Sequence, residues 1–118
     1  YYADLNWKEL MKAIRSVKVS YKEISKFPAV KRDLALLLDK KVQFAEIEKI
    51  AYETEKKLLK EVSLFDVYEG KNLEAGKKSY AVSFLLQDES QTLNDKMIDK
   101  IMSKLVKNLE DKLGAKLR

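Results

Sequence analysis

The stretch LFDVYEGKNLEAGKKSYAV, residues 64–82, places two alternating polar and apolar runs on either side of a turn. In the first run, LFDVY, apolar residues alternate with an acid and a tyrosine, and the turn is bounded by two glycines. Such two-residue alternation is typical of a strand with one buried face, and glycines in a short connection favour a hairpin. Residues 59–70 and 77–88 are therefore predicted to be antiparallel neighbours.

The segments around this hairpin supply the remaining elements of a domain. Upstream, leucines at every second position from 34 to 38 predict a strand over residues 30–39. Apolar residues at three- and four-residue steps over 44–58 then predict an amphipathic helix. Downstream, Thr92 and Asp95 resemble a capping box that opens a second helix, and residues 115–118 could add a short strand. The order predicts an α+β, ferredoxin-like βαββαβ sandwich with a four-stranded antiparallel sheet.

The N-terminal part of the chain has a different pattern. Asn6 and Glu9 resemble a capping box, and helical spacing follows over residues 6–16. The single proline, Pro28, favours extended geometry just before it. We therefore expect an N-terminal arm over 1–26, formed by a helix and a connector, and a main domain over 27–118.

Alternation also predicts which side chains face the two helices of the main domain. Right-handed crossovers place both helices on one face of the sheet, so the other face stays open. The more apolar set is expected to meet the helices: Leu34, Leu36, Leu38, Phe65, Val67, Tyr80, Val82, Phe84 and Leu86. The outward set is small or polar for the most part: Asp33, Ala35, Leu37, Asp66, Tyr68, Ser79, Ala81 and Ser83.

Composition excludes several classes of chemistry. The 118 residues contain no cysteine and no histidine, which rules out disulfides, thiolate or imidazole catalysis and the usual zinc ligands. The formal charge is +5, but residues 1–26 hold six Lys and Arg against three Asp and Glu, and the rest of the chain holds 18 against 16. Net charge is thus a weak argument for nucleic-acid binding.

With no long apolar run and no signal-like N-terminus, we expect a cytoplasmic protein.

Asp66 and Tyr68 give the predicted open face its chemistry. A bare four-stranded sheet is a common platform for single-stranded RNA, whose bases stack on aromatic rings. Tyr68 supplies a ring, and the Asp66 carboxylate offers two acceptors to the paired N–H donors of guanine. The alternative is that both side chains only solvate an exposed strand.

The segments FPAVKRDLALLLD, LFDVYEG, GKKSYAVSF, DESQTLND and LGAKLR resemble the C-terminal region of bacterial phenylalanyl-tRNA synthetase beta subunits. The resemblance implies a ferredoxin-fold anticodon-binding domain over 27–118, preceded by the end of a catalytic-like module. It implies a non-catalytic fragment that reads the anticodon loop of tRNA(Phe). In the parent, an alpha2beta2 tetramer, the alpha subunit charges the tRNA with ATP and magnesium.

Residue by residue, the resemblance matches Asp66 and Tyr68 to contacts of the first anticodon base, a guanine. It matches Ser79 to a further contact, with Ala81 beside it on the same expected face. Candidate phosphate contacts are Lys31, Lys71, Lys77, Lys78 and Arg118, because lysines and arginines at strand ends can position RNA. Arg32 points toward the predicted helix side, where pairing with an acid is an equal alternative.

Two other classes are weaker alternatives. A regulatory small-molecule sensor of the same topology would need a glycine-bearing turn after the first strand, and LDKKVQF has none. An acylphosphatase-like hydrolase would need an anion-cradling loop with arginine, and that loop carries lysines. The aspartates form no metal-binding loop pattern, so no metal is expected.

Overall fold

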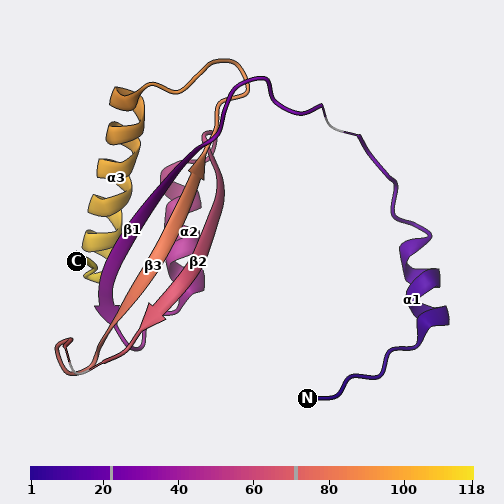
Figure 1. Ribbon diagram of the computed structural model, residues 1–118, viewed down its shortest axis with the longest axis horizontal. Helices are drawn as coiled ribbons and strands as arrows, with labels where there is room; N and C mark the ends of the chain where they lie inside the picture. The colour runs from indigo at the N-terminus through magenta and orange to yellow at the C-terminus, as the bar shows by residue number, and fades with distance from the viewer. Residues whose placement is uncertain (22, 71) are drawn as a thin grey trace.

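The computed structural model describes residues 1–21, 23–70 and 72–118, so the candidate Lys71 lies outside the described residues. The helices and strands follow the predicted order after an N-terminal helix (Figure 1): α1 (Trp7–Ile14), β1 (Val30–Asp39), α2 (Phe44–Thr54), β2 (Leu59–Tyr68), β3 (Lys77–Leu86), α3 (Asp95–Leu113) and β4 (Lys116–Leu117).

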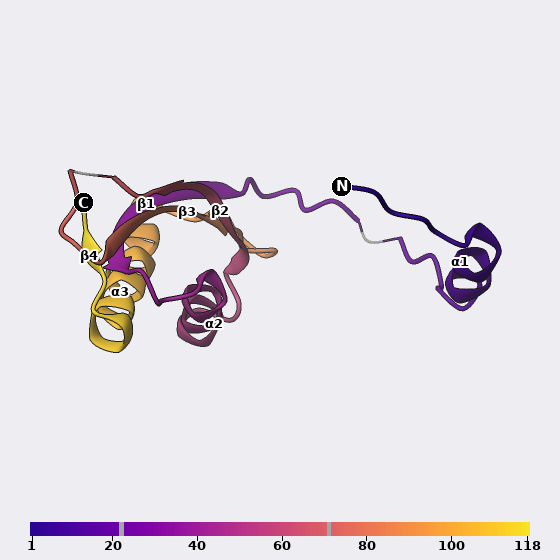
Figure 2. The ribbon, with the colours of Figure 1, turned by 90° about the horizontal axis from the view of Figure 1, so that it is seen from below.

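In these described residues, four strands form one antiparallel sheet in the order β2-β3-β1-β4. β1 and β3 pair along their full lengths, from Val30 opposite Leu86 to Asp39 opposite Lys77. Helices α2 and α3 lie side by side beneath one face, and no helix covers the other face in this part of the chain (Figure 2). The predicted ferredoxin-like sandwich with an open sheet face is therefore confirmed.

The core lies between the sheet and the two helices. Phe84 of β3 is fully buried and belongs to one apolar cluster with leucines and isoleucines from both layers. The apolar stripes of the two helices reach this core through buried residues: Ile47, Ile50 and Ala51 from α2, and Ile98, Ile101, Leu105 and Leu109 from α3. Removal of this apolar surface from water stabilises the layer packing and fixes which strand face remains open.

The start of α3 differs from the sequence prediction. Asn94, rather than Thr92, is the N-cap: its side-chain oxygen accepts a hydrogen bond from the Met97 amide at 2.9 Å. The expected Thr92–Asp95 capping box is therefore wrong, because the first helical residue is Asp95 itself. The helix ends at Gly114, whose φ of 61° is the left-handed conformation that glycine adopts without steric cost.

The arm confirms the predicted short helix. The Asn6 side chain accepts from the Glu9 amide at 3.3 Å, and α1 ends at Ile14. No residue of α1 is buried, and Figure 1 shows the helix lying apart from the sheet at the end of an extended connector. Its apolar side chains therefore have no contact with the core described above.

Candidate nucleic-acid interface on the open sheet face

Asp66 and Tyr68 lie side by side on the open face of the sheet. Asp66 pairs across the strands with Ala81, and Tyr68 with Ser79. Val67 between them pairs with the buried Tyr80, which faces the helices. Because paired residues of neighbouring strands point to the same face, the carboxylate and the phenol are directed away from the helical layer.

The surroundings of Asp66 form a shallow floor. Asp66 on β2 is the cross-strand partner of Ala81 on β3, which in turn pairs with Ala35 on β1. Two methyl groups therefore lie beside the carboxylate. In a nearby row Ser83 donates to Asp33 at 2.5 Å, so this second open-face acid already has a protein donor. Among the residues that the structure describes, none donates a hydrogen bond to Asp66. This carboxylate thus keeps both acceptor oxygens for a ligand.

Tyr68 is held between two neighbours. The Arg118 guanidinium lies 5.5 Å from the ring centroid, at a distance typical of a cation–π contact. Arg118 reaches this position because β4 pairs with β1 and its own amide donates to the Ala35 carbonyl at 3.0 Å. On the hydroxyl side, a Cβ added at Gly70 would overlap the Tyr68 phenol. The ring is therefore preoriented, and its stacking surface is shared with Arg118.

Phe65 does not face the helices, which corrects the sequence prediction. The pairing of β2 with β3 shifts between Leu64, opposite Val82, and Asp66, opposite Ala81, so Phe65 forms a β-bulge without a cross-strand partner. Its side chain is 59% exposed. The signal was present in the sequence: apolar alternation changes phase where Leu64 and Phe65 stand next to each other.

The candidate cations divide between the two sides of the sheet. Lys31 lies on the open face, with its Nζ 6.0 Å from the Phe65 ring centroid, and Lys77 is paired with Asp39 at the hairpin end. Lys78, by contrast, is only 7% exposed, and its Nζ lies 4.5 Å from the Tyr80 ring centroid on the helix side. The structure does not bring Lys78 together with the other candidates, because strand alternation turns it inward.

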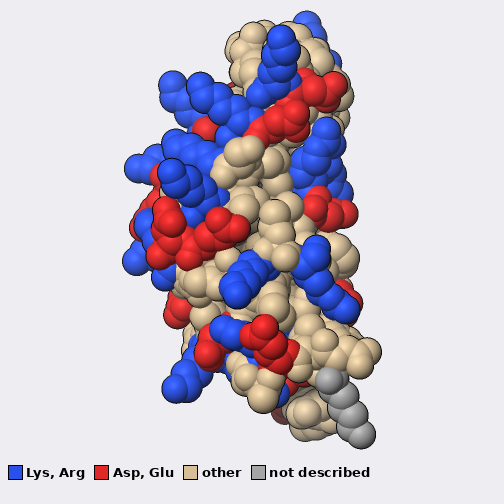
Figure 3. Space-filling view, turned by 90° about the vertical axis from the view of Figure 1, so that its left-hand side faces the viewer, with Lys and Arg blue, Asp and Glu red and all other residues tan. Residues whose placement is uncertain are grey.

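Surface charge outside this face is mixed. Arg32 lies on the helix side, 3.9 Å from the carboxylate of Asp95 at the start of α3. On the side of the molecule where α3 lies, cationic and anionic side chains are interspersed with uncharged surface (Figure 3). Cations on that side are thus accompanied by acids, which weakens its attraction for phosphates.

The loop between β1 and α2 has its backbone amides engaged. Lys40 donates to the Gly76 carbonyl at 2.9 Å, Lys41 to the Asp39 carboxylate at 3.0 Å, and Val42 to the Asp39 carbonyl at 3.1 Å. The Lys41 amide is the main reason that the pKa of Asp39 lies below its ordinary value. Three successive amides thus have protein acceptors, and the loop presents no ready cradle for an anion or a small ligand.

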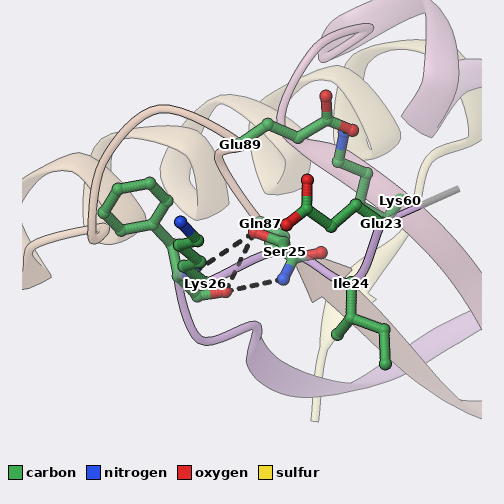
Figure 4. A pocket seen from close by; sticks show the side chains of 8 residues that line it. Glu23, Ile24, Ser25, Lys26, Lys60, Gln87 and Glu89 are labelled. Carbon is green, nitrogen blue, oxygen red and sulfur yellow. Dashed lines mark hydrogen bonds and ion pairs between the residues drawn. The ribbon is translucent and has the colours of Figure 1, made fainter.

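A pocket lies at the end of the sheet opposite Tyr68, where the connector before β1 is bound to the domain. It lies where residues 23–27 meet the ends of β2 and β3, and Figure 4 shows Gln87 directed at the connector. The Gln87 side-chain amide donates to the Phe27 carbonyl at 2.7 Å, and Lys60 pairs with Glu89 at 3.3 Å. These contacts explain the pocket as a structural junction, separate from Asp66 and Tyr68.

Over residues 1–21, 23–70 and 72–118, no three acidic side chains gather in a way that would hold a metal ion. Within the same residues, no helix combines the length and the apolar character that crossing a bilayer requires.

The strand order and the single helical layer define a domain of the ferredoxin-like class. A family model described as "Ferredoxin-fold anticodon binding domain" matches residues 25–118. The chain belongs to this family, and the resemblance inferred from its motifs is confirmed.

Curated relatives agree with this assignment. Over all 118 residues the chain is 94% identical to the phenylalanine–tRNA ligase beta subunit of Bacteroides thetaiotaomicron and 60% identical to that of Porphyromonas gingivalis. It is 44% identical over 106 residues, 90% of the chain, to the corresponding subunit of Bacillus subtilis. The chain spans 14% of the length of the first two relatives and 13% of the third.

Proposed function

We propose that the open sheet face binds the anticodon loop of tRNA(Phe), and that Asp66 and Tyr68 recognise its first base, a guanine. One observation carries the proposal: the Asp66 carboxylate, which accepts no hydrogen bond from the described residues, stands beside an exposed aromatic ring on the uncovered face. The carboxylate matches the adjacent N–H and NH₂ donors of guanine, and the ring provides a stacking surface.

The residues around Asp66 and Tyr68 are small enough for a planar base to lie on the sheet. Ala81 and Ala35 carry only methyl groups beside Asp66, which lets a base approach the sheet closely, and Ser79, 5% exposed, is the cross-strand partner of Tyr68. We assign Ser79 to a hydrogen bond with a loop nucleotide and Ala81 to close approach. A base that stacks on Tyr68 has to displace the Arg118 guanidinium, which then lies near the RNA backbone and can contact a phosphate together with Lys31 and Lys77.

The role within a longer protein follows from the relatives. We infer that the parent is a phenylalanine–tRNA ligase of the cytoplasm, in which an alpha subunit completes an alpha2beta2 tetramer and charges tRNA(Phe) using ATP and magnesium. We assign residues 1–26 to the end of a preceding module, since α1 buries none of its apolar side chains here. Residues 27–118 supply recognition and no catalytic group.

The test is a titration of the chain with anticodon stem-loops of tRNA(Phe) that carry guanine, inosine or adenine at the first position. The wild-type chain should prefer guanine, and Asp66→Asn should reduce that preference by about 1–3 kcal/mol, because one acceptor becomes a donor. Fluorescence anisotropy of labelled stem-loops measures the difference.

Asp33→Asn is the matched control, since Asp33 is an acid on the same face whose carboxylate is bonded to Ser83. It should leave base preference unchanged. Equal discrimination by the wild-type chain and Asp66→Asn would contradict the proposed role of Asp66.

A further inference from the structure

The bulge in β2 places Phe65 and Asp66 on the same side of the sheet. In a regular strand, successive side chains point to opposite faces. Here Leu64 and Val67 pair with the buried Val82 and Tyr80, so both residues between them face away from the helices. The phenyl ring is therefore presented beside the carboxylate that the preceding section assigns to RNA, and at 59% it is more exposed than Tyr68 at 38%.

Lys31 reaches the same spot from another strand. Its neighbours Val30 and Arg32 pair with the buried Leu86 and Phe84, so Lys31 itself belongs to the open face. Its Nζ lies 6.0 Å from the Phe65 ring centroid, although β3 separates β1 from β2 in the sheet. An exposed aromatic ring with an ammonium group beside it combines a surface for a base with a charge for a phosphate.

We propose that Phe65 and Lys31 form a second nucleotide subsite, in which the ring stacks a further base of the same RNA loop and the ammonium contacts that nucleotide's phosphate. The inference rests on the proposed function and adds a contact beyond Asp66 and Tyr68. Phe65 and Tyr68 are three residues apart in an extended strand, a separation of roughly 10 Å at about 3.3 Å per residue, which is well above the roughly 3.4 Å rise between stacked nucleotides. The bases on Phe65 and Tyr68 are therefore splayed apart, as in an open loop.

Lys31 also favours RNA, and not a protein surface of the parent enzyme, as the molecule that binds at Phe65. Protein interfaces are depleted in lysine at their centres, whereas sites for single-stranded nucleic acid combine cations with aromatic rings. A protein occupant would be expected to bring an acid to Lys31, and its contact with Phe65 would not depend on RNA.

The experiment compares Phe65→Ala, Phe65→Trp and Lys31→Ala with the wild-type chain in titrations of the tRNA(Phe) anticodon stem-loop at several salt concentrations. Phe65→Ala should weaken binding about 5- to 100-fold without changing the salt dependence, because a stacking contact releases no counterions. Phe65→Trp should bind at least as well as the wild-type chain. Lys31→Ala should weaken binding and lower the slope of log affinity against log salt by about 0.7.

Val67→Ala is the matched control, because Val67 is an exposed apolar residue of the same strand that faces the other side. It should bind as the wild-type chain does. An equal loss for Val67→Ala and Phe65→Ala would mean damage to the strand and would overturn the subsite, as would an unchanged affinity of Phe65→Ala. If Tyr68→Ala still weakens binding in that case, the proposed function stands and only the subsite fails. If the wild-type chain does not bind the stem-loop, both fail.

Discussion

At the scale of single residues, the position of Tyr68 depends on the absence of a side chain at Gly70. The phenol lies against the backbone of Gly70, where a methyl group would overlap its hydroxyl. Gly70 does not have a positive φ, in contrast to Gly76 at 83°, so its role is to leave space for the ring rather than to allow a left-handed turn. The two glycines that bound the same loop therefore serve different purposes.

Gly70→Ala should consequently displace the Tyr68 ring and weaken stem-loop binding, by up to the 1–3 kcal/mol that a stacking contact contributes. Because Tyr68 and Gly70 are both exposed, the melting temperature should change little. Gly76→Ala should show the opposite pattern, since it strains a left-handed position by about 1–2 kcal/mol and has open space around its Cβ. Binding by Gly70→Ala at wild-type affinity would show that Tyr68 does not need its present position.

At the scale of elements, the N-cap of α3 is a direct test of the corrected helix start. Asn94→Ala should lower the free energy of unfolding by about 1 kcal/mol, because the Met97 amide loses its acceptor. Thr92→Ala should have little effect, since Thr92 is exposed and lies outside the helix. Urea denaturation of both variants measures the difference, and equal losses would favour Thr92 as a contributor to the cap.

Periodicity predicted both helices and the three long strands of the domain, because the helical stripes and the strand alternation are long and regular. It also predicted that Asp66 and Tyr68 share the open face. The orientation of Phe65 was predicted wrongly, because one phase of alternation was carried through the step from Leu64 to Phe65, where a bulge changes the relation between sequence position and face. Arg118 could be named as a cation, but its contact with Tyr68 depends on β4 pairing with β1, a tertiary event that local pattern does not encode.

At the scale of the whole molecule, three carboxylates link stability to pH. The pKa values of Asp39, Glu53 and Asp88 are lowered by a backbone amide, by Lys112 and by Ser90 respectively. The folded state therefore binds fewer protons than the unfolded state in the acid range. Their contribution to stability is complete above the unfolded pKa values of about 4 and is lost as pH falls through the folded values.

Urea midpoints measured between pH 7 and pH 3 should therefore be steady down to about pH 5 and then fall. Ser90→Ala should reduce the fall, because Ser90 donates to Asp88 from its hydroxyl at 2.7 Å and removal of that donor raises the Asp88 pKa toward its ordinary value. A fall of equal size in Ser90→Ala and in the wild-type chain would contradict this linkage.

The register shifts in β2 also bear on how the sheet meets other molecules. β2 is ten residues long and stands at the edge of the sheet, where unpaired backbone groups would offer a template for a strand of a second molecule. Its register shifts twice, around Lys60 and around Phe65. A foreign strand could follow such an edge for only a few residues before its hydrogen bonds fell out of step, so the same irregularity that exposes Phe65 protects the domain from edge-to-edge aggregation.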